Sequence, residues 1–442
     1  MKKRLLWMVV LALAMSLLCV SCASTKLNGA GDGGHYYAPA GYSSETYPDY
    51  ASSEKGKVSS MGTEDSLREE TPDGKPDMDI DVTNNRQQRS GLITASAWDD
   101  NNNYDSWKAL FNQQSENEEA GKFADYIGNS WKFDTLNRVK VTVKNGENFV
   151  CGATVSTIGA DQKEYKAVTN ANGVAYIFPK DEEGTITVTS GEGAGSAAFT
   201  AESRDLTVEL TSNAGKVNLI KLMFVVDVTG SMGDELNYLA NEITDVIGRI
   251  ARNDDQTHID LAFLFYRDNG DNDKLDYVEF KNVTDPAGLA EQQRILSTKY
   301  ATGGGDIPEA LDEALLMAVN KNWGEENSTK IIFHVFDAPS HSNKDNRTRC
   351  GQAAEIAAEK GIRYCPVLCS GADLLCEYIA RQGAVYTGGT FIFVTDHSGI
   401  GNPHYDPNVP NAVVEKLNDL MVRLVIGYHT GTFAAPVWWN AK

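Results

Sequence analysis

The chain lacks an excess of positive charge. Its 40 Lys and Arg residues are outnumbered by 61 Asp and Glu residues, so the formal net charge is −21. Nucleic-acid binding and electrostatic docking on anionic lipid both need a basic face, and this charge balance argues against both functions. It is compatible with a well-hydrated surface and with binding of a divalent cation.

Several catalytic and metal-binding signatures are also missing. The sequence has no GxSxG motif and no HExxH motif, and the five cysteines after residue 22 contain no CxxC pair, which argues against a serine hydrolase of that type, a zincin and a cysteine zinc site. The "TGGGD" stretch at 302–306 lacks the lysine of a phosphate-binding P-loop. Four histidines of the C-terminal half have no metal-ligand spacing and are expected on the surface or in supporting roles: His334, His341, His397 and His404.

Cysteines are few. Of the seven, Cys19 and Cys22 lie near the N-terminus, and the other five are an odd number for an exported protein. Four of these crowd into 350–376, which predicts one or two disulfides there. Cys369 ends a predicted strand and Cys376 lies one helical turn into the next element, so this pair, which could meet if the loop folds back, is the first choice.

The N-terminus has the pattern of a targeting segment. Three basic residues at 2–4 precede an apolar run at 5–20 that is shorter than most membrane spans and ends in "CVSC". The junction resembles a bacterial lipoprotein signal, with Cys19 where leucine is usual. We therefore predict a signal peptide over 1–21, lipid modification of Cys22 and a lipid-anchored location in the bacterial cell envelope. An ordinary cleaved signal peptide is the alternative.

Three further segments precede the C-terminal half. Residues 22–90 are rich in Gly, Ser, Tyr, Pro and acidic residues without apolar periodicity, so we predict a flexible tether. Residues 91–135 have helix-like aromatic spacing, which predicts short helices of unknown role. Residues 136–212 alternate apolar and polar residues with turn signals, which predicts a small β-sandwich. Through "TNANGVAYIF" this part resembles carboxypeptidase-regulatory-like, Ig-type modules.

From residue 218 to residue 430 the pattern changes to strands alternating with helices. The near-continuous apolar runs "IKLMFVVD" and "KIIFHVFDA" are typical of central parallel strands. The alternation predicts an α/β fold with a doubly wound, mostly parallel sheet. Residues 431–442 are expected to form a C-terminal tail. Ligands of such sheets bind outside the carboxyl ends of the strands, where Asp227 and Asp337 fall.

Oxygen-bearing side chains gather at these predicted strand ends. Asp227, Thr229 and Ser231 alternate along one tight loop, and Asp337 ends the other strand. Carboxylate and hydroxyl oxygens are ligands that suit Mg²⁺, Mn²⁺ or Ca²⁺. The sequence therefore predicts a site for one of these ions, with Mg²⁺ first.

These residues resemble a known motif. "DVTGS" is similar to the DxSxS signature of von Willebrand factor type A domains, and the resemblance extends over about 219–430. The resemblance implies a metal-ion-dependent adhesion site (MIDAS), in which the ion keeps one coordination position for an acidic group of a partner. It implies that Asp227, Thr229 and Ser231 are first-loop ligands and that Asp337 is the distal-loop ligand.

The middle loop departs from the family. The usual threonine ligand aligns with Gly305, which offers no hydroxyl, and Asp306 follows it. Asp306 is the nearest oxygen donor, either as a direct ligand or through a water while it caps the helix predicted after Pro308. We predict the water-mediated role, with direct ligation as the alternative.

Together these features predict an envelope lipoprotein whose A domain binds a carboxylate of a protein partner through a divalent cation. The other expected contact is with the membrane through the lipid anchor, and no nucleic-acid partner is expected. One alternative is a metal-assisted hydrolase, with Asp306 or His341 as the candidate base. Another is an envelope-assembly factor rather than an adhesin.

Overall fold

The computed structural model describes residues 91–439, except 115–119, 127–130, 132, 212–217, 254–255, 306, 400–401 and 408. The predicted signal peptide, Cys22, the tether and Asp306 lie outside the described residues. Within the described part of the chain, no helix has the length and apolar character needed to cross a bilayer.

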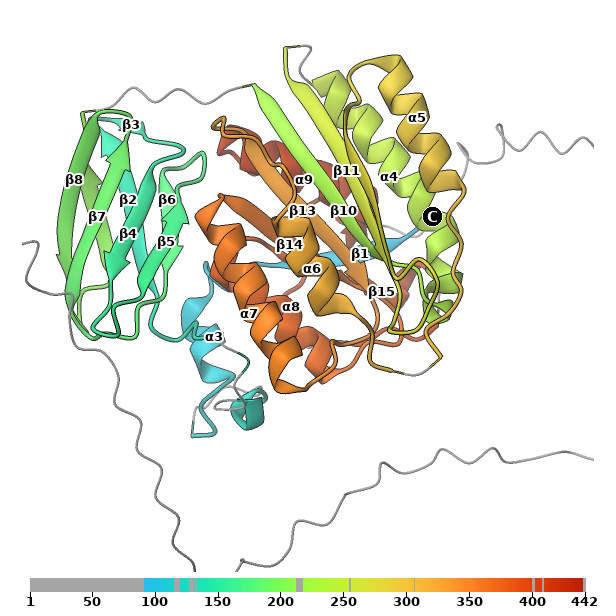
Figure 1. Cartoon of the computed structure of the whole chain (residues 1–442), viewed down its shortest axis with the longest axis horizontal. Coiled ribbons are helices and arrows are strands. Elements are labelled where there is room, and N and C mark those ends of the chain that lie inside the picture. Colours follow the sequence, from blue (N-terminus) through green and yellow to red (C-terminus); the bar gives the residue numbers. More distant parts are fainter. Residues whose placement is uncertain are drawn as a thin grey trace, which may run out of the picture. The chain divides into compact units, whose positions relative to one another are not determined.

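A twisted eight-stranded sheet forms the centre of the C-terminal half (Figure 1). The strands are listed here in their order across the sheet: β12 (Leu275–Asn282), β11 (His258–Tyr266), β10 (Leu219–Asp227), β13 (Thr329–Phe336), β14 (Ile362–Leu368), β15 (Phe391–Thr395), β1 (Thr94–Trp98) and β16 (Glu415–Lys416). The five strands from β11 to β15 run parallel to one another. The predicted α/β fold with a mostly parallel sheet is confirmed.

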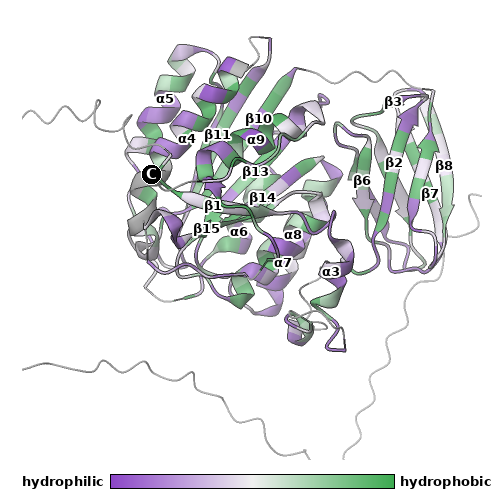
Figure 2. Cartoon of the chain, turned by 180° about the vertical axis from the view of Figure 1, so that it is seen from behind, coloured by the Kyte–Doolittle hydropathy of each residue, from purple (hydrophilic) through white to green (hydrophobic). Residues whose placement is uncertain are grey.

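Helices cover both faces of this sheet. One face carries α6 (Leu311–Val319), α7 (Lys344–Glu359) and α8 (Leu374–Thr387), and the other carries α4 (Gly233–Asn253), α5 (Pro286–Ser297) and α9 (Leu417–Thr430). Because both faces are covered, β10, β13 and β14 are buried along nearly their whole length. This explains their unbroken apolar runs, which are green in the centre of Figure 2.

The segment 91–135 differs from its prediction as a purely helical stretch. It contains helix α3 (Tyr104–Ala109) and the 3₁₀ turn η1 (Ala124–Tyr126), but it begins with strand β1. β1 runs antiparallel to β15, with Thr94 opposite Thr395, and also pairs with β16. The A domain therefore begins before the β-sandwich in the chain rather than at residue 218. Period-two alternation in five residues was too short to reveal β1 in the sequence.

Residues 139–209 form eight strands in two four-stranded sheets. One sheet contains β2 (Val139–Asn145), β3 (Asn148–Phe149), β6 (Val174–Ile177) and β9 (Asp205–Glu209), and the other contains β4 (Thr154–Ile158), β5 (Glu164–Val168), β7 (Gly184–Ser190) and β8 (Gly193–Phe199). Every second residue of β2, β4 and β7 is buried. The alternation that predicted strands therefore marks the side chains between the two sheets.

The sandwich is inserted into the A domain and packs against it. β5 contacts α7 and β6 contacts α8, and the apolar core of the sandwich is continuous with the core under these helices. Phe178 stacks on Tyr386 with ring centroids 4.9 Å apart, and Lys163 pairs with Glu355 at 2.5 Å. Among the described residues, the core of the sandwich and the core under α6, α7 and α8 thus form one connected apolar core.

A buried ion cluster ties the segment after β1 to helix α8. Arg381 donates to both carboxylate oxygens of Asp100, at 2.9 and 2.5 Å, and to Glu377 at 2.7 Å. Lys122 and Tyr405 complete the shell of Glu377, each at 2.9 Å from Oε2. These charges are paired and hydrogen-bonded, as buried charges must be to persist.

The predicted disulfide between Cys369 and Cys376 is not formed in the structure. The Cys376 thiol contacts the backbone carbonyl of Asp337 at 3.6 Å, and the Cys369 thiol contacts that of Val367 at 3.8 Å. Cys369 packs in the core on the α4 side of the sheet, whereas Cys376 packs in the core on the α7 side. The two thiols therefore lie on opposite faces of the sheet. Their short separation along the sequence does not reveal this.

Asp100→Ala should destabilise the protein strongly, because it leaves the buried Arg381 with only Glu377 as a counter-ion. Removing one partner of a buried pair costs about 3–5 kcal/mol, and urea unfolding will measure the loss. The matched control is Asp105→Ala, since Asp105 is exposed and pairs with Lys108 at 2.8 Å on the surface of α3. We expect a loss of less than about 1 kcal/mol there. Equal losses in both variants would contradict the proposed importance of the cluster.

Candidate functional site

Four loops meet at the carboxyl ends of β10, β11 and β13. Gly230 N donates to Gly303 O at 3.1 Å, and Thr302 N donates to Val228 O at 3.0 Å, which joins the first loop to the middle loop. The loop after β11 joins them through Arg267, whose Nε donates to Thr302 O at 2.9 Å. Glu309 N donates to Pro339 O at 2.9 Å, which adds the loop after β13. The backbone thus holds together the loops that carry the predicted site residues.

The first loop presents Asp227, Thr229 and Ser231 together. Asp227 is fully buried at the end of β10, and its Oδ1 accepts from Thr229 N at 2.9 Å and from Thr229 Oγ1 at 2.6 Å. Thr229 Oγ1 lies 3.3 Å from Ser231 Oγ. The 3₁₀ turn η2 (Gly230–Met232) then leads into α4. The alternation noticed in the sequence therefore places three side-chain oxygens in one contiguous group.

Asp337 is the first residue after β13 and is 4% exposed. Because β10 and β13 pair in parallel with Val226 opposite Val335, Asp227 and Asp337 reach the same edge of the sheet. Burial, and then the negative charge of Asp337, raise the pKa of Asp227 to about 7. The structure therefore brings together these two predicted carboxylates, and their charges oppose each other.

The middle loop approaches the first loop through glycine backbone. Gly303, Gly304 and Gly305 all have positive φ, which side-chain-bearing residues rarely adopt. A Cβ on Gly304 would lie 2.8 Å from Glu309 Oε1 and 3.1 Å from Thr229 Cβ, so only glycine fits there. Gly304 N donates to Asp271 Oδ2 at 2.8 Å. Gly305 brings no oxygen-bearing side chain to the site, in agreement with the departure seen in the sequence.

Glu309 is the site residue that sequence reasoning missed. Its side chain is 3% exposed, and burial followed by the charges of Asp227, Asp268, Asp337 and Asp271 raises its pKa to about 8. The sequence placed Glu309 in the first turn of a helix, but α6 begins at Leu311, so Glu309 belongs to the loop. The signal available in the sequence was a carboxylate four residues after a run of three glycines.

Two of these carboxylates have an oxygen that accepts no hydrogen bond within the described part of the chain. They are Oδ2 of Asp227 and Oε2 of Glu309, and both atoms are buried. An unsatisfied buried carboxylate oxygen costs free energy unless a proton or a cation meets it. Together with the hydroxyls of Thr229 and Ser231, these oxygens match the ligands that Mg²⁺, Mn²⁺ or Ca²⁺ prefer.

A chain of buried aromatic polar groups lies behind Asp227. The Tyr266 hydroxyl lies 2.9 Å from His334 Nε2, and His334 Nδ1 lies 2.7 Å from the Tyr364 hydroxyl. Burial lowers the pKa of His334 to about 3, so this imidazole is neutral at physiological pH. Tyr266 also acts to lower the pKa of Asp227. His334 is thus a supporting residue inside the sheet and not a surface histidine, and both roles were considered from the sequence.

The other three histidines considered in the sequence analysis lie apart from one another. His341 Nε2 is 2.7 Å from Asp268 Oδ1 at the rim of the four loops, His404 Nδ1 is 2.7 Å from Asp396 Oδ1, and His397 contacts the ring of Trp439. The described residues contain no group of three or more His, Cys, Asp or Glu side chains arranged to hold a metal ion by themselves. An ion at Asp227 would therefore need hydroxyl or water ligands as well.

A second set of contacts fixes the loop after β13. The buried carboxylate of Asp312 in α6 accepts from Ser340 Oγ at 2.9 Å, from Asn346 Nδ2 at 3.0 Å and from Arg349 Nε at 2.5 Å. Ser340 also forms a β-bridge with Glu309. Asp337 and Glu309 are thus held from behind by α6 and α7.

Comparison with known families adds an independent finding. Residues 221–359 match the family model described as von Willebrand factor A domain. The chain is similar to the alpha-protein kinase vwkA of Dictyostelium discoideum, with 27% identity over 168 residues. This match covers 38% of the chain and 26% of that protein.

Solved structures show more distant likenesses. The pilus adhesin SpaC from Lactobacillus rhamnosus GG has 11% identity and a TM-score of 0.31, with 47% of this chain and 29% of that chain covered. The conserved hypothetical protein BatB from Bacteroides thetaiotaomicron has 14% identity and a TM-score of 0.30, with 39% of this chain and 89% of that chain covered. At these values neither likeness carries an argument about function.

The match over 221–359 begins within β10 and ends with α7, so it includes the first, middle and distal loops of the site. The chain therefore contains a von Willebrand factor A domain, a kind of domain that generally mediates protein binding or adhesion.

Proposed function

We propose that the A domain binds an acidic group of a protein partner through a divalent cation, with Mg²⁺ as the first candidate. The observation that carries this proposal is the pair of buried carboxylate oxygens, Asp227 Oδ2 and Glu309 Oε2, that accept no hydrogen bond among the described residues. Asp227, Thr229, Ser231 and Asp337 would hold the ion, and Glu309 is a further candidate because it and Thr229 both lie against Gly304.

The ion would supply positive charge where this chain concentrates negative charge. Burial, and then the like charges of neighbouring carboxylates, raise the pKa values of Asp227 and Glu309. Where Asp227 and Asp337 are the only carboxylates in direct contact, a divalent cation stays electrophilic and attracts one more carboxylate from outside. That extra ligand is the acidic group of the partner in this proposal.

The proposed setting is the bacterial cell envelope. The proposal follows from the N-terminal segment, in which a basic start and an apolar run precede Cys22. Lipid modification of Cys22 would anchor the chain, and the stretch 22–90 would hold the described domains away from the membrane. The role is adhesion to another cell or assembly of envelope components, and a partner isolated by the experiment below distinguishes them.

A metal-assisted hydrolase is the second candidate. The observation that favours it is the short contact between His341 and Asp268, at 2.7 Å, beside the proposed ion site. A histidine oriented by a buried carboxylate is a common general base. Phosphatase and peptidase assays with and without EDTA test this candidate, because chelator-sensitive turnover that His341→Ala abolishes is expected only for an enzyme.

Removing the metal should lower the stability of the A domain. At a Mg²⁺ concentration one hundred times the dissociation constant, binding to the folded state adds about 2.7 kcal/mol, which thermal unfolding with and without EDTA will show. Asp227→Asn should abolish this difference. It should also leave the metal-free stability at or above that of the wild type, because it removes the repulsion between Asp227 and Asp337.

The matched control is Asp205→Asn, since Asp205 is an exposed residue of β9 that lies 3.7 Å from Lys140. This variant should keep the full response to Mg²⁺. An equal response of wild type and Asp227→Asn would contradict the site assignment.

Partner binding should depend on the same ion. Cross-linking and pull-down of the tagged full chain from native membranes should capture a protein in Mg²⁺ that is lost in EDTA. Asp227→Asn should lose it in both conditions. Capture of the same proteins regardless of chelator and substitution would refute metal-mediated binding, and the identity of the captured protein decides between adhesion and assembly.

Calorimetric titration of Mg²⁺ into two variants separates the candidate middle-loop ligands. If Glu309 contacts the ion directly, Glu309→Gln should weaken binding by at least about tenfold, since a buried charged ligand is lost. Asp306→Asn should weaken it only slightly if Asp306 acts through a water, as we propose. A large loss for Asp306→Asn with a small loss for Glu309→Gln would reverse these roles.

Membrane attachment should depend on Cys22. Cys22→Ser should release the chain from the membrane fraction or leave it uncleaved, because the lipid-bearing thiol is absent. Fractionation and mass measurement of the N-terminal peptide will show which occurs. Normal processing and unchanged fractionation of Cys22→Ser would support an ordinary signal peptide instead.

A further inference from the structure

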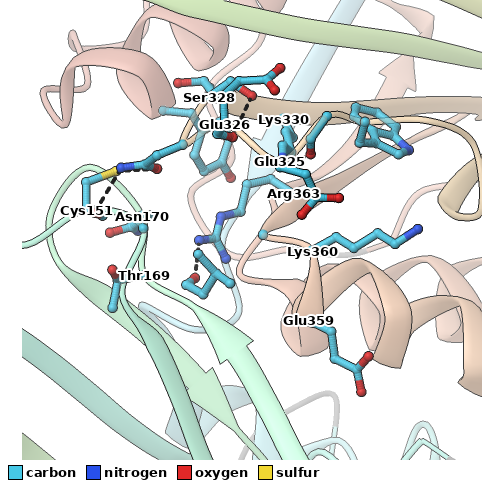
Figure 3. A pocket seen from close by; sticks show the side chains of 18 of the residues that line it. Cys151, Thr169, Asn170, Glu325, Glu326, Ser328, Lys330, Glu359, Lys360 and Arg363 are labelled. Atoms are coloured by element: carbon cyan, nitrogen blue, oxygen red, sulfur yellow. Dashed lines mark hydrogen bonds between the residues drawn. The ribbon is translucent and has the colours of Figure 1, made fainter. Parts of the chain in front are cut away.

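A cavity of about 430 Å³ lies where the β-sandwich meets the A domain (Figure 3). Its walls come from the loops around Cys151 and Thr169 in the sandwich, from the segment 321–330 that leads into β13, and from the turn between α7 and β14. These are the amino ends of the A-domain strands, so the cavity is at the opposite edge of the sheet from Asp227. Its volume is within the range of about 300–1,000 Å³ typical of small-molecule sites.

Arg363, the second residue of β14, lines this cavity although it is only 5% exposed. One terminal nitrogen donates to Thr387 O at 2.6 Å and the other to Val168 O at 2.7 Å. Both acceptors are neutral backbone carbonyls, and no ion pair of Arg363 with a carboxylate occurs within the described residues. A guanidinium stays charged in proteins, so a positive charge is buried here without a counter-ion.

The surroundings of Arg363 compensate this charge only in part. Thr387 is the last residue of α8, and the carboxyl end of a helix carries a partial negative charge. Burial lowers the pKa of Arg363, and the groups that act in the opposite direction are Tyr428, Cys151, Tyr176 and Cys365. None of them is a carboxylate. The guanidinium also has five N–H donors, more than its two carbonyl partners require.

Further positive charge lines the same cavity. Lys330 and Lys360 donate to backbone carbonyls of Gly324 and Val319, at 3.2 and 2.8 Å. Glu326 pairs with Lys221 at 3.3 Å, and the charges of Glu326 and Glu325 also act on Lys330, so they compensate the lysines rather than Arg363. Four basic and three acidic residues line the cavity, in a chain whose net charge is −21. The cavity is thus a local exception to the acidity of the protein.

We propose that this cavity is a binding site for a small carboxylate or phosphate anion, held by Arg363 and assisted by Lys330. The planar fork of a guanidinium matches the paired oxygens of either group. Because Arg363 already contacts Val168 of the sandwich and Thr387 of the A domain, an anion bound to it would hold the two domains together. The site is independent of the metal at Asp227.

The test is calorimetric titration of the folded full chain in EDTA with two separate probes, inorganic phosphate and succinate. We expect saturable one-site binding of at least one probe, and the stronger of the two identifies the preferred anion. Arg363→Lys should weaken it by at least about tenfold, because the charge remains but the bidentate fork is lost. Lys330→Gln should weaken it by a smaller factor.

The matched control is Lys281→Gln, since Lys281 is an exposed residue of β12 that pairs with Glu291 at 3.1 Å. Its anion affinity should equal that of the wild type. No saturable binding of either probe would overturn the proposal, and so would unchanged affinity in both Arg363→Lys and Lys330→Gln with native circular dichroism. If Arg363→Lys does not fold, the comparison of Lys330→Gln with Lys281→Gln decides.

Discussion

Repulsion between carboxylates buried at one edge of the sheet is the constraint around which the A domain is built. Asp227 and Asp337 end neighbouring parallel strands, and Glu309 reaches the same place from the middle loop. Burial, and then the charges of neighbouring carboxylates, raise the pKa values of Asp227 and Glu309, so ionising them inside this site costs free energy. In the proposed function, a divalent cation would relieve this repulsion.

The surroundings hold these groups in place in spite of that repulsion. Tyr266, His334 and Tyr364 form a hydrogen-bonded chain through the sheet behind Asp227. Asp312 holds the loop of Asp337 through Ser340, and the glycines of the middle loop allow backbone to approach Thr229 closely. The loops are therefore fixed before a ligand arrives, which lowers the entropy cost of binding.

The inserted β-sandwich packs against one side of the A domain. It contacts α7 and α8, the helices that also support the loop of Asp337, through the Phe178–Tyr386 stack and the Lys163–Glu355 pair. Arg363 adds a charged connection between the two domains at the far end of the sheet. The site at Asp227 and the cavity at Arg363 thus lie at opposite ends of the same strands.

The sequence alone was enough to predict the α/β fold and to place Asp227, Thr229, Ser231 and Asp337 at the carboxyl ends of its strands, because strand periodicity and adjacency along the chain are local properties. The tertiary structure decided the rest. Glu309 joins the site only because three glycines turn the loop back, and β1 joins the sheet across almost 300 residues of sequence from β15. Cys369 and Cys376 are close in sequence but lie on opposite faces of the sheet. Such relations depend on long-range packing, which local residue patterns do not encode.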